Sequence, residues 1–171
     1  MSFLDRLLGR SVDDRAPVRP LWHRSVEIAR EKPWYASYGL EDTVPGRFDA
    51  VTMVLSLVIL RMEQDESLKH MTARLTELFV DDMDGQLRQS GVGDLVVGKR
   101  MCKLMMVLGG RMGALREALA DADSITALIP VLDRNMSLLE GADRNALAGA
   151  VLELSRTLQN TTPEALLAGE I

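Results

Sequence analysis

The sequence of 171 residues predicts an all-α fold, built as a single multi-helix domain of about six to eight helices. Apolar residues recur at helical spacing over long stretches, and no segment alternates apolar and polar residues with a period of two. Aromatic residues make up only 4% of the chain, whereas β-strands are enriched in aromatic and β-branched residues. A chain of this length is typical of one domain with a sizeable core.

The first 20 residues are expected to form an amphipathic segment followed by a linker. Four apolar residues share one side of a short predicted helix: Phe3, Leu4, Leu7 and Leu8. This apolar run is too short and interrupted for a signal peptide, and the aspartates that follow argue against a transit peptide. Packing on the body, docking on a partner and weak membrane contact are alternative roles for it. Residues 11–20, with two prolines, are predicted to be the linker, so the helical domain is placed at residues 21–171.

Helix-breaking residues and the spacing of apolar residues predict where the remaining helices and loops lie. A helix is predicted over residues 21–31, because Pro33 disfavours helix before it. Residues 33–47 are predicted to be a loop packed on the body, because five of the seven aromatic residues lie between positions 22 and 48. Two short helices are also predicted: one begins at Ser124 and is broken or restarted by Pro130, and the last is opened by Thr162-Pro163-Glu164. The longer helices are predicted over residues 46/47–65, 66–89, 95–119 and 145–159. The longest apolar run, residues 50–60, is shorter than the roughly 20 residues of a membrane span and indicates a buried core helix.

Charge is distributed unevenly along the chain. The net charge of −5 argues against a DNA-binding protein. Residues 85–116 nevertheless carry six basic residues and one acid, whereas residues 117–171 carry three basic residues and nine acids. The sequence therefore predicts a basic helix and an acidic C-terminal part. The single cysteine, Cys102, excludes an internal disulfide and fits a reducing compartment.

No pattern of reactive residues predicts catalysis, a metal site or a cofactor. The acidic cluster of Asp81, Asp82 and Asp84 lies on a predicted helix, so a solvent-exposed acidic face is a better interpretation than a metal-binding loop. Asp82 is placed to pair with a basic residue of a neighbouring helix. Neither of the two histidines, His23 and His70, has a spacing to Cys102 that suggests a catalytic pair. Cys102 is therefore expected to be a passive, buried or half-buried thiol. We therefore expect a protein that is not an enzyme and holds no cofactor.

The predicted helix at residues 95–119 is unusual in its methionines and glycines. Met101, Met105 and Met112 follow its apolar stripe and are expected to fill the core, whereas Met106 lies on another face with the lysines. The alternative is a deformable apolar surface for a hydrophobic client. Gly109 and Gly113 share one face, which predicts either the close approach of a second helix or a kink.

The basic residues of the same helix are candidates for partner binding. A solvated face is the ordinary fate of such a cluster, and an acidic protein, ribosomal RNA or anionic lipid head groups are the alternatives. The candidate client or partner residues are Lys99, Arg100, Lys103, Met106 and Arg111.

Two blocks of sequence resemble the ubiquinol–cytochrome c chaperone family. The first leads into the apolar helix and contains Asp42, Thr43, Gly46, Arg47 and Phe48. The second contains the end of one helix, a glycine turn, and an aspartate that caps the start of the next helix. Its residues are Asp82, Asp84, Gly91, Gly93, Asp94 and Gly98. With the matching order of helices, the resemblance covers roughly residues 20–120.

The resemblance implies a non-enzymatic assembly factor for the cytochrome bc1 complex. Mitochondrial members of the family hold newly made cytochrome b near the ribosomal exit, together with a small partner protein. The absence of a transit peptide implies a bacterial cytoplasmic protein, peripheral at the cytoplasmic face of the inner membrane, with cytochrome b or another bc1 subunit as its client. The small partner and the ribosome contact remain open. A helical adaptor for a soluble regulatory protein and an unrecognised enzyme are the rival hypotheses.

Overall fold

The computed structural model describes the backbone of residues 13–89 and 94–171, and the side chains of residues 13–89 and 98–171. Two short 3-10 helices, η1 and η2, span Ala16–Val18 and Lys69–Met71. The α-helices are α2 (Arg19–Ala29), α3 (Lys32–Ala36), α4 (Val44–Glu63), α5 (Thr72–Gln89), α6 (Asp94–Ala120), α7 (Ser124–Asn135), α8 (Arg144–Asn160) and α9 (Pro163–Ala168). The predicted single all-α domain is confirmed, and the described backbone contains no strand beyond an isolated bridge between Leu40 and Leu138.

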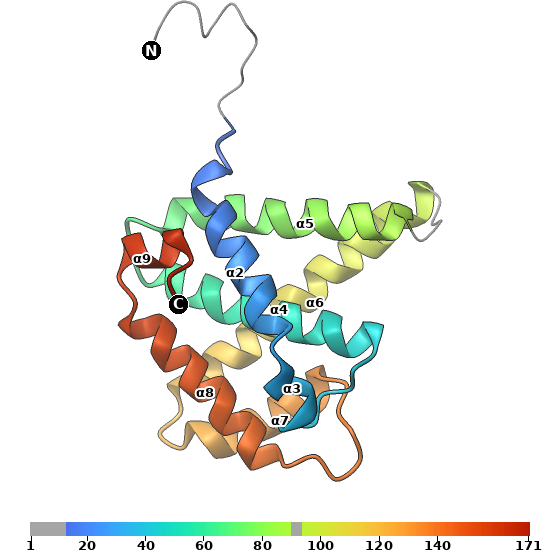
Figure 1. Cartoon of the computed structure of the whole chain (residues 1–171), viewed down its shortest axis with the longest axis vertical. Coiled ribbons are helices and arrows are strands. Elements are labelled where there is room, and N and C mark those ends of the chain that lie inside the picture. The colour runs from blue at the N-terminus through green and yellow to red at the C-terminus, as the bar shows by residue number, and fades with distance from the viewer. Residues whose placement is uncertain (1–12, 90–93) are drawn as a thin grey trace, which may run out of the picture.

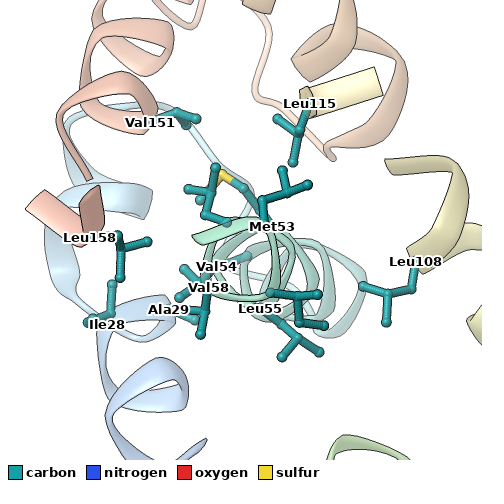
Figure 2. Packing of buried hydrophobic residues seen from close by; sticks show 14 of the residues in the cluster. Ile28, Ala29, Met53, Val54, Leu55, Val58, Leu108, Leu115, Val151 and Leu158 are labelled. Carbon is teal, nitrogen blue, oxygen red and sulfur yellow. The ribbon is translucent and has the colours of Figure 1, made fainter. Parts of the chain in front are cut away.

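Helix α4 forms the centre of the molecule. Figure 2 views this helix along its axis, with Ile28 of α2 and Leu158 of α8 together on one side of it and Leu108 of α6 on the opposite side. Because its sequence is apolar nearly all round, the helix is stable only when neighbours cover every face. The prediction of a buried core helix is therefore confirmed.

Helices α5 and α6 diverge from their shared end. Figure 1 shows that they lie close where α5 finishes and α6 starts, and that α6 then runs away from α5 across the molecule toward α7. Helix α2 contacts both α4 and α5. Its Trp22 ring lies edge-on to Phe79 of α5, with ring centroids 6.0 Å apart, and Phe79 also contacts Phe48 of α4. This aromatic cluster joins α2, α4 and α5.

The aromatic loop is packed as predicted, although it contains a short helix. Trp34 is 5% exposed, and its indole Nε1 donates a hydrogen bond to the carbonyl of Ile28 at 2.8 Å. Tyr35 donates its hydroxyl to the carbonyl of Ala29 at 2.7 Å. These bonds satisfy carbonyls at the end of α2 and close α3 onto it.

Prolines account for two departures from the prediction. Pro17 and Pro20 start η1 and α2, so the described part of the expected linker is structured, and Val18 is only 1% exposed. Pro130 neither breaks nor restarts α7. Burial of Leu128 and Leu132 on its apolar face holds the helix together around one missing hydrogen bond.

In the part of the chain that the structure describes, no helix combines the length and apolar character needed to cross a membrane. The short helix expected within residues 1–12 lies outside the described residues.

Candidate functional site

A groove of about 530 Å³ opens between the diverging helices α5 and α6, and part of α4 lies at its base. Its apolar lining comes from three helices: Ile59 of α4, Ala73 and Val80 of α5, and Met105, Leu108 and Met112 of α6. Glu63, Thr76 and Asp81 add polar atoms at the edges. A concave surface of this kind, apolar in the middle and polar at its rim, is typical of a binding site.

Two methionines of α6 face this groove, and a third faces away from it. Met105 is 37% exposed and Met112 is partly buried, and both line the groove. Met106 is 71% exposed on another side of the helix, about 100° further round. Met101 and Met112 pack against the core as expected, whereas Met105 does not fill it, because the divergence of α5 leaves its side chain in the open groove.

Ion pairs fix the rim of the groove to the chain that precedes η1. Arg15 lines the groove and donates to the carboxylate of Asp81 on α5. Asp14 lies 2.6 Å from a guanidinium nitrogen of Arg74, also on α5. The pKa of Asp13 falls to about 2, chiefly because Arg19 donates a hydrogen bond to it. Asp13 is therefore ionised at neutral pH, and its bonds to Arg15 and Arg19 join the start of the described chain to α2.

The predicted basic residues form a separate surface on α6. Lys99, Arg100 and Lys103 are all exposed, and the exposed Met106 lies about one turn beyond Lys103. We call these four residues the basic surface. Cys102, expected to be buried or half-buried, is exposed beside them as a free thiol.

The glycines of α6 leave its exposed backbone uncovered. A Cβ atom added at Gly109 or Gly113 would meet nothing within 4 Å among the described residues. The close approach of a second helix, one of the two alternatives expected there, is therefore absent, because Gly109 lines the open α5–α6 groove. Gly98 and Gly110 are equally open.

Arg111 does not join the basic surface. It is 8% exposed, and its guanidinium donates to the carboxylate of Asp49 and to the hydroxyl of Thr52, both on α4. The same carboxylate accepts hydrogen bonds from the backbone N–H and the hydroxyl of Ser137, at 2.9 and 2.7 Å. The sequence contained a signal for the burial of Arg111, because this residue lies three residues after Leu108 and four before Leu115, on the same buried face of the helix.

The first family-like block forms the start of α4. Thr43 is its N-cap and accepts a hydrogen bond from the backbone N–H of Gly46 at 3.2 Å. No residue with a side chain fits at position 46, since a Cβ atom on Gly46 would lie 2.0 Å from the carbonyl oxygen of Glu41. Arg47 donates to Asp42 at 2.6 Å, and this hydrogen bond lowers the pKa of Asp42. These residues, with Phe48 in the aromatic cluster, fix where the central helix begins.

In the second block, the acidic residues have specific partners. Asp82 accepts a hydrogen bond from the indole Nε1 of Trp22 at 2.7 Å, so its partner is an aromatic donor rather than the expected basic residue. Asp84 pairs with Arg88 one turn later on the same helix. Gly91, Gly93 and the side chain of Asp94 lie outside the described residues. His23 and His70 are exposed, and no described cluster of histidine, cysteine or carboxylate side chains could hold a metal ion.

Residues 36–171 match the ubiquinol–cytochrome c chaperone family. The chain belongs to this family. The match extends the resemblance beyond residue 120 through α7, α8 and α9 to the end of the chain. Comparison with curated proteins gives no significant match.

A solved member supports the same assignment over nearly the whole chain. The crystal structure of the Cbp3 homolog from Brucella abortus is similar with a TM-score of 0.78 and 31% sequence identity. The similarity covers 99% of this chain and 95% of the Brucella chain. The groove and the basic surface therefore lie on a fold that this chaperone family shares.

Proposed function

We propose that this protein is a non-enzymatic assembly chaperone for the cytochrome bc1 complex, and that it binds newly made cytochrome b at the cytoplasmic face of the inner membrane. Membership of the ubiquinol–cytochrome c chaperone family supports the assembly role. The observation that supports client binding is the apolar groove between α5 and α6, where Met105 and Met112 face a hollow of about 530 Å³.

Methionine suits the temporary binding of a membrane-protein segment. Its unbranched thioether side chain adapts to apolar surfaces of different shape without the fixed complementarity of a branched residue. Met105 and Met112 line the α6 side of the groove, Val80 lies on the α5 side, and Ile59 of α4 lies at the base. A client segment bound here would be shielded from water until it docks with other subunits.

The basic surface would orient the loaded chaperone. Lys99, Arg100 and Lys103 point into solvent from one end of α6, and Met106 adds an exposed apolar side chain among them. Anionic lipid head groups attract such clusters within a Debye length, and ribosomal RNA near the exit region offers the same charge. A small partner protein with an acidic surface would use the same residues.

Met105→Glu is expected to abolish most client binding, because it places a carboxylate in the middle of the apolar groove. Burying that charge without a partner costs at least about 2 kcal/mol, or about 30-fold in affinity. A strain lacking the chromosomal copy is complemented with the variant, and its membranes are compared by reduced-minus-oxidised spectra of bc1-associated cytochrome b. Ile125→Glu is the matched control, because Ile125 is 39% exposed, like Met105, but lies on α7 outside the groove. Equal spectra for the two variants would argue against the groove as the client site.

Replacing Lys99, Arg100 and Lys103 together with glutamate is expected to reduce assembled bc1 complex without unfolding the protein. The three side chains are exposed, so their reversal changes surface charge and leaves the core intact. The measurement is the same difference spectrum, with circular dichroism of the purified variant as the folding control. Unchanged assembly would show that the basic surface has no orienting role.

The rival hypothesis is an adaptor for a soluble regulatory protein. It would gain support if the protein captured a soluble partner through the basic surface while bc1 assembly remained normal in its absence.

A further inference from the structure

Residues 1–12, which lie outside the described residues, carry four apolar side chains. Phe3, Leu4, Leu7 and Leu8 are spaced to lie on one side of a helix, with Asp5 and the arginines on the other. An apolar stripe of this kind is only marginally stable unless a surface covers it. The open question is which surface does so.

The described chain starts at the rim of the α5–α6 groove. Arg15 is itself a lining residue and is paired with Asp81, while Asp14 is paired with Arg74. Both partner residues lie on α5, so two consecutive side chains fix the backbone just before η1 against this helix. The segment therefore begins beside the groove, whatever direction it then takes.

The distances involved are short. An extended chain covers about 3.5 Å per residue, so the stretch between Leu8 and Asp13, where the described chain starts, can span about 17 Å. A helix over residues 3–8 would be about 9 Å long at 1.5 Å per residue. A segment of this size fits the scale of a groove lined from Thr72 to Asp81 along α5.

We propose that residues 3–8 of the same chain occupy the α5–α6 groove when no client is bound, as an intramolecular occupant that the client displaces. The apolar stripe of this segment would cover Met105, Met112 and Val80. This inference goes beyond the proposed function, because it concerns the free protein and holds whatever the client is.

Tethering makes such a short segment effective. A short flexible linker gives an effective concentration of the order of 1 mM, so a segment with an intrinsic dissociation constant of about 0.1 mM would occupy the groove about 90% of the time. Occupancy at this level would weaken the apparent affinity for any client about tenfold. The groove would then be shielded from nonspecific apolar partners, while a client that binds tightly could still enter.

Oxidation of individual methionines tests the proposal in the purified full-length protein without any client. From their exposed fractions, 37% and 71%, Met105 should react only about twofold more slowly than Met106 if the groove is empty. If residues 3–8 cover it, Met105 should react at least about tenfold more slowly than Met106 in the native chain. The double variant Leu7→Asp with Leu8→Asp should return the ratio to about two, because it removes the apolar stripe. A ratio near two in both proteins would overturn the proposal.

A photo-crosslink identifies the occupant. With p-benzoylphenylalanine in place of Phe3, irradiation should produce crosslinks to Met105 and Met112 within one chain and none to Met106. Met106 is the matched control, since it has the same chemistry, lies on the same helix and is more exposed. A mixture of isotope-labelled and unlabelled protein separates crosslinks within a chain from those between chains. Crosslinks between chains, or to Met106 as often as to Met105, would overturn the proposal even if the protein still supported bc1 assembly.

Discussion

Asp49→Ala is expected to lower the free energy of unfolding by about 3–5 kcal/mol, the cost of leaving a buried charge without its partner. The side chains of Asp49 and Arg111 are only 11% and 9% exposed. Removing the carboxylate leaves the guanidinium of Arg111 with Thr52 as its remaining partner, and its Nε already has none. It also removes the acceptor of two hydrogen bonds from Ser137. Urea unfolding followed by circular dichroism measures the loss.

The double variant Asp49→Leu with Arg111→Met isolates the charge. Replacing a buried ion pair with apolar residues of similar volume is often neutral or stabilising, so this variant should be more stable than Asp49→Ala. Ser137 loses its acceptor in both proteins, and the difference between them therefore reports the unpaired arginine. If the double variant were the less stable of the two, burial of the charge would not explain the loss.

Phe79→Ala is expected to cost a similar amount, about 3–5 kcal/mol, because it creates a cavity where three helices meet. Phe79 is fully buried, and its ring contacts both Trp22 and Phe48. Neither α2 nor α4 can move in to fill the space without loosening the other, so little of the cavity should collapse. Thermal and chemical unfolding of the purified variant measure the effect.

Phe79→Leu is the control for this cavity. Leucine retains much of the buried apolar volume, so we expect this variant to recover most of the lost stability. A loss as large as that of Phe79→Ala would show that ring stacking, rather than filled volume, accounts for the effect.

The sequence predicted the long helices well because each carries a signal that local physics controls. The apolar character of α4 requires burial on all sides, and the caps and breakers around α8 and α9 act within a few residues. The aromatic loop was also predictable, since large rings in a short segment are stable only when they are packed. The spacing of apolar residues did not show, however, which neighbouring helix each face would contact or whether it would face solvent.

The site depends on that missing information. Met105 lies close to the apolar stripe of α6, but its exposure follows from the angle between α5 and α6, which no local pattern encodes. The helical spacing of Arg111 to buried leucines was visible, yet its partner Asp49 is 62 residues away and had to be found in three dimensions. The open face at Gly109 has the same origin, because only the position of neighbouring helices decides whether a glycine is covered. Family resemblance supplied the function that these local patterns could not.

The buried pair between Asp49 and Arg111 has a mechanical consequence for α6. It attaches this helix to the central helix part-way along its length, with Leu115 and Ala118 packed in the core beyond that point. The stretch before it carries the groove methionine Met105 and the basic surface, and three uncovered glycines lie at or next to the attachment. Leu108 is also buried in the core, three residues before Arg111, so α6 is held against α4 by apolar packing on both sides of the ion pair. A widening of the groove at Met105 would therefore require α5 to move or the first turns of α6 to bend, while the attachment at Arg111 stays in place.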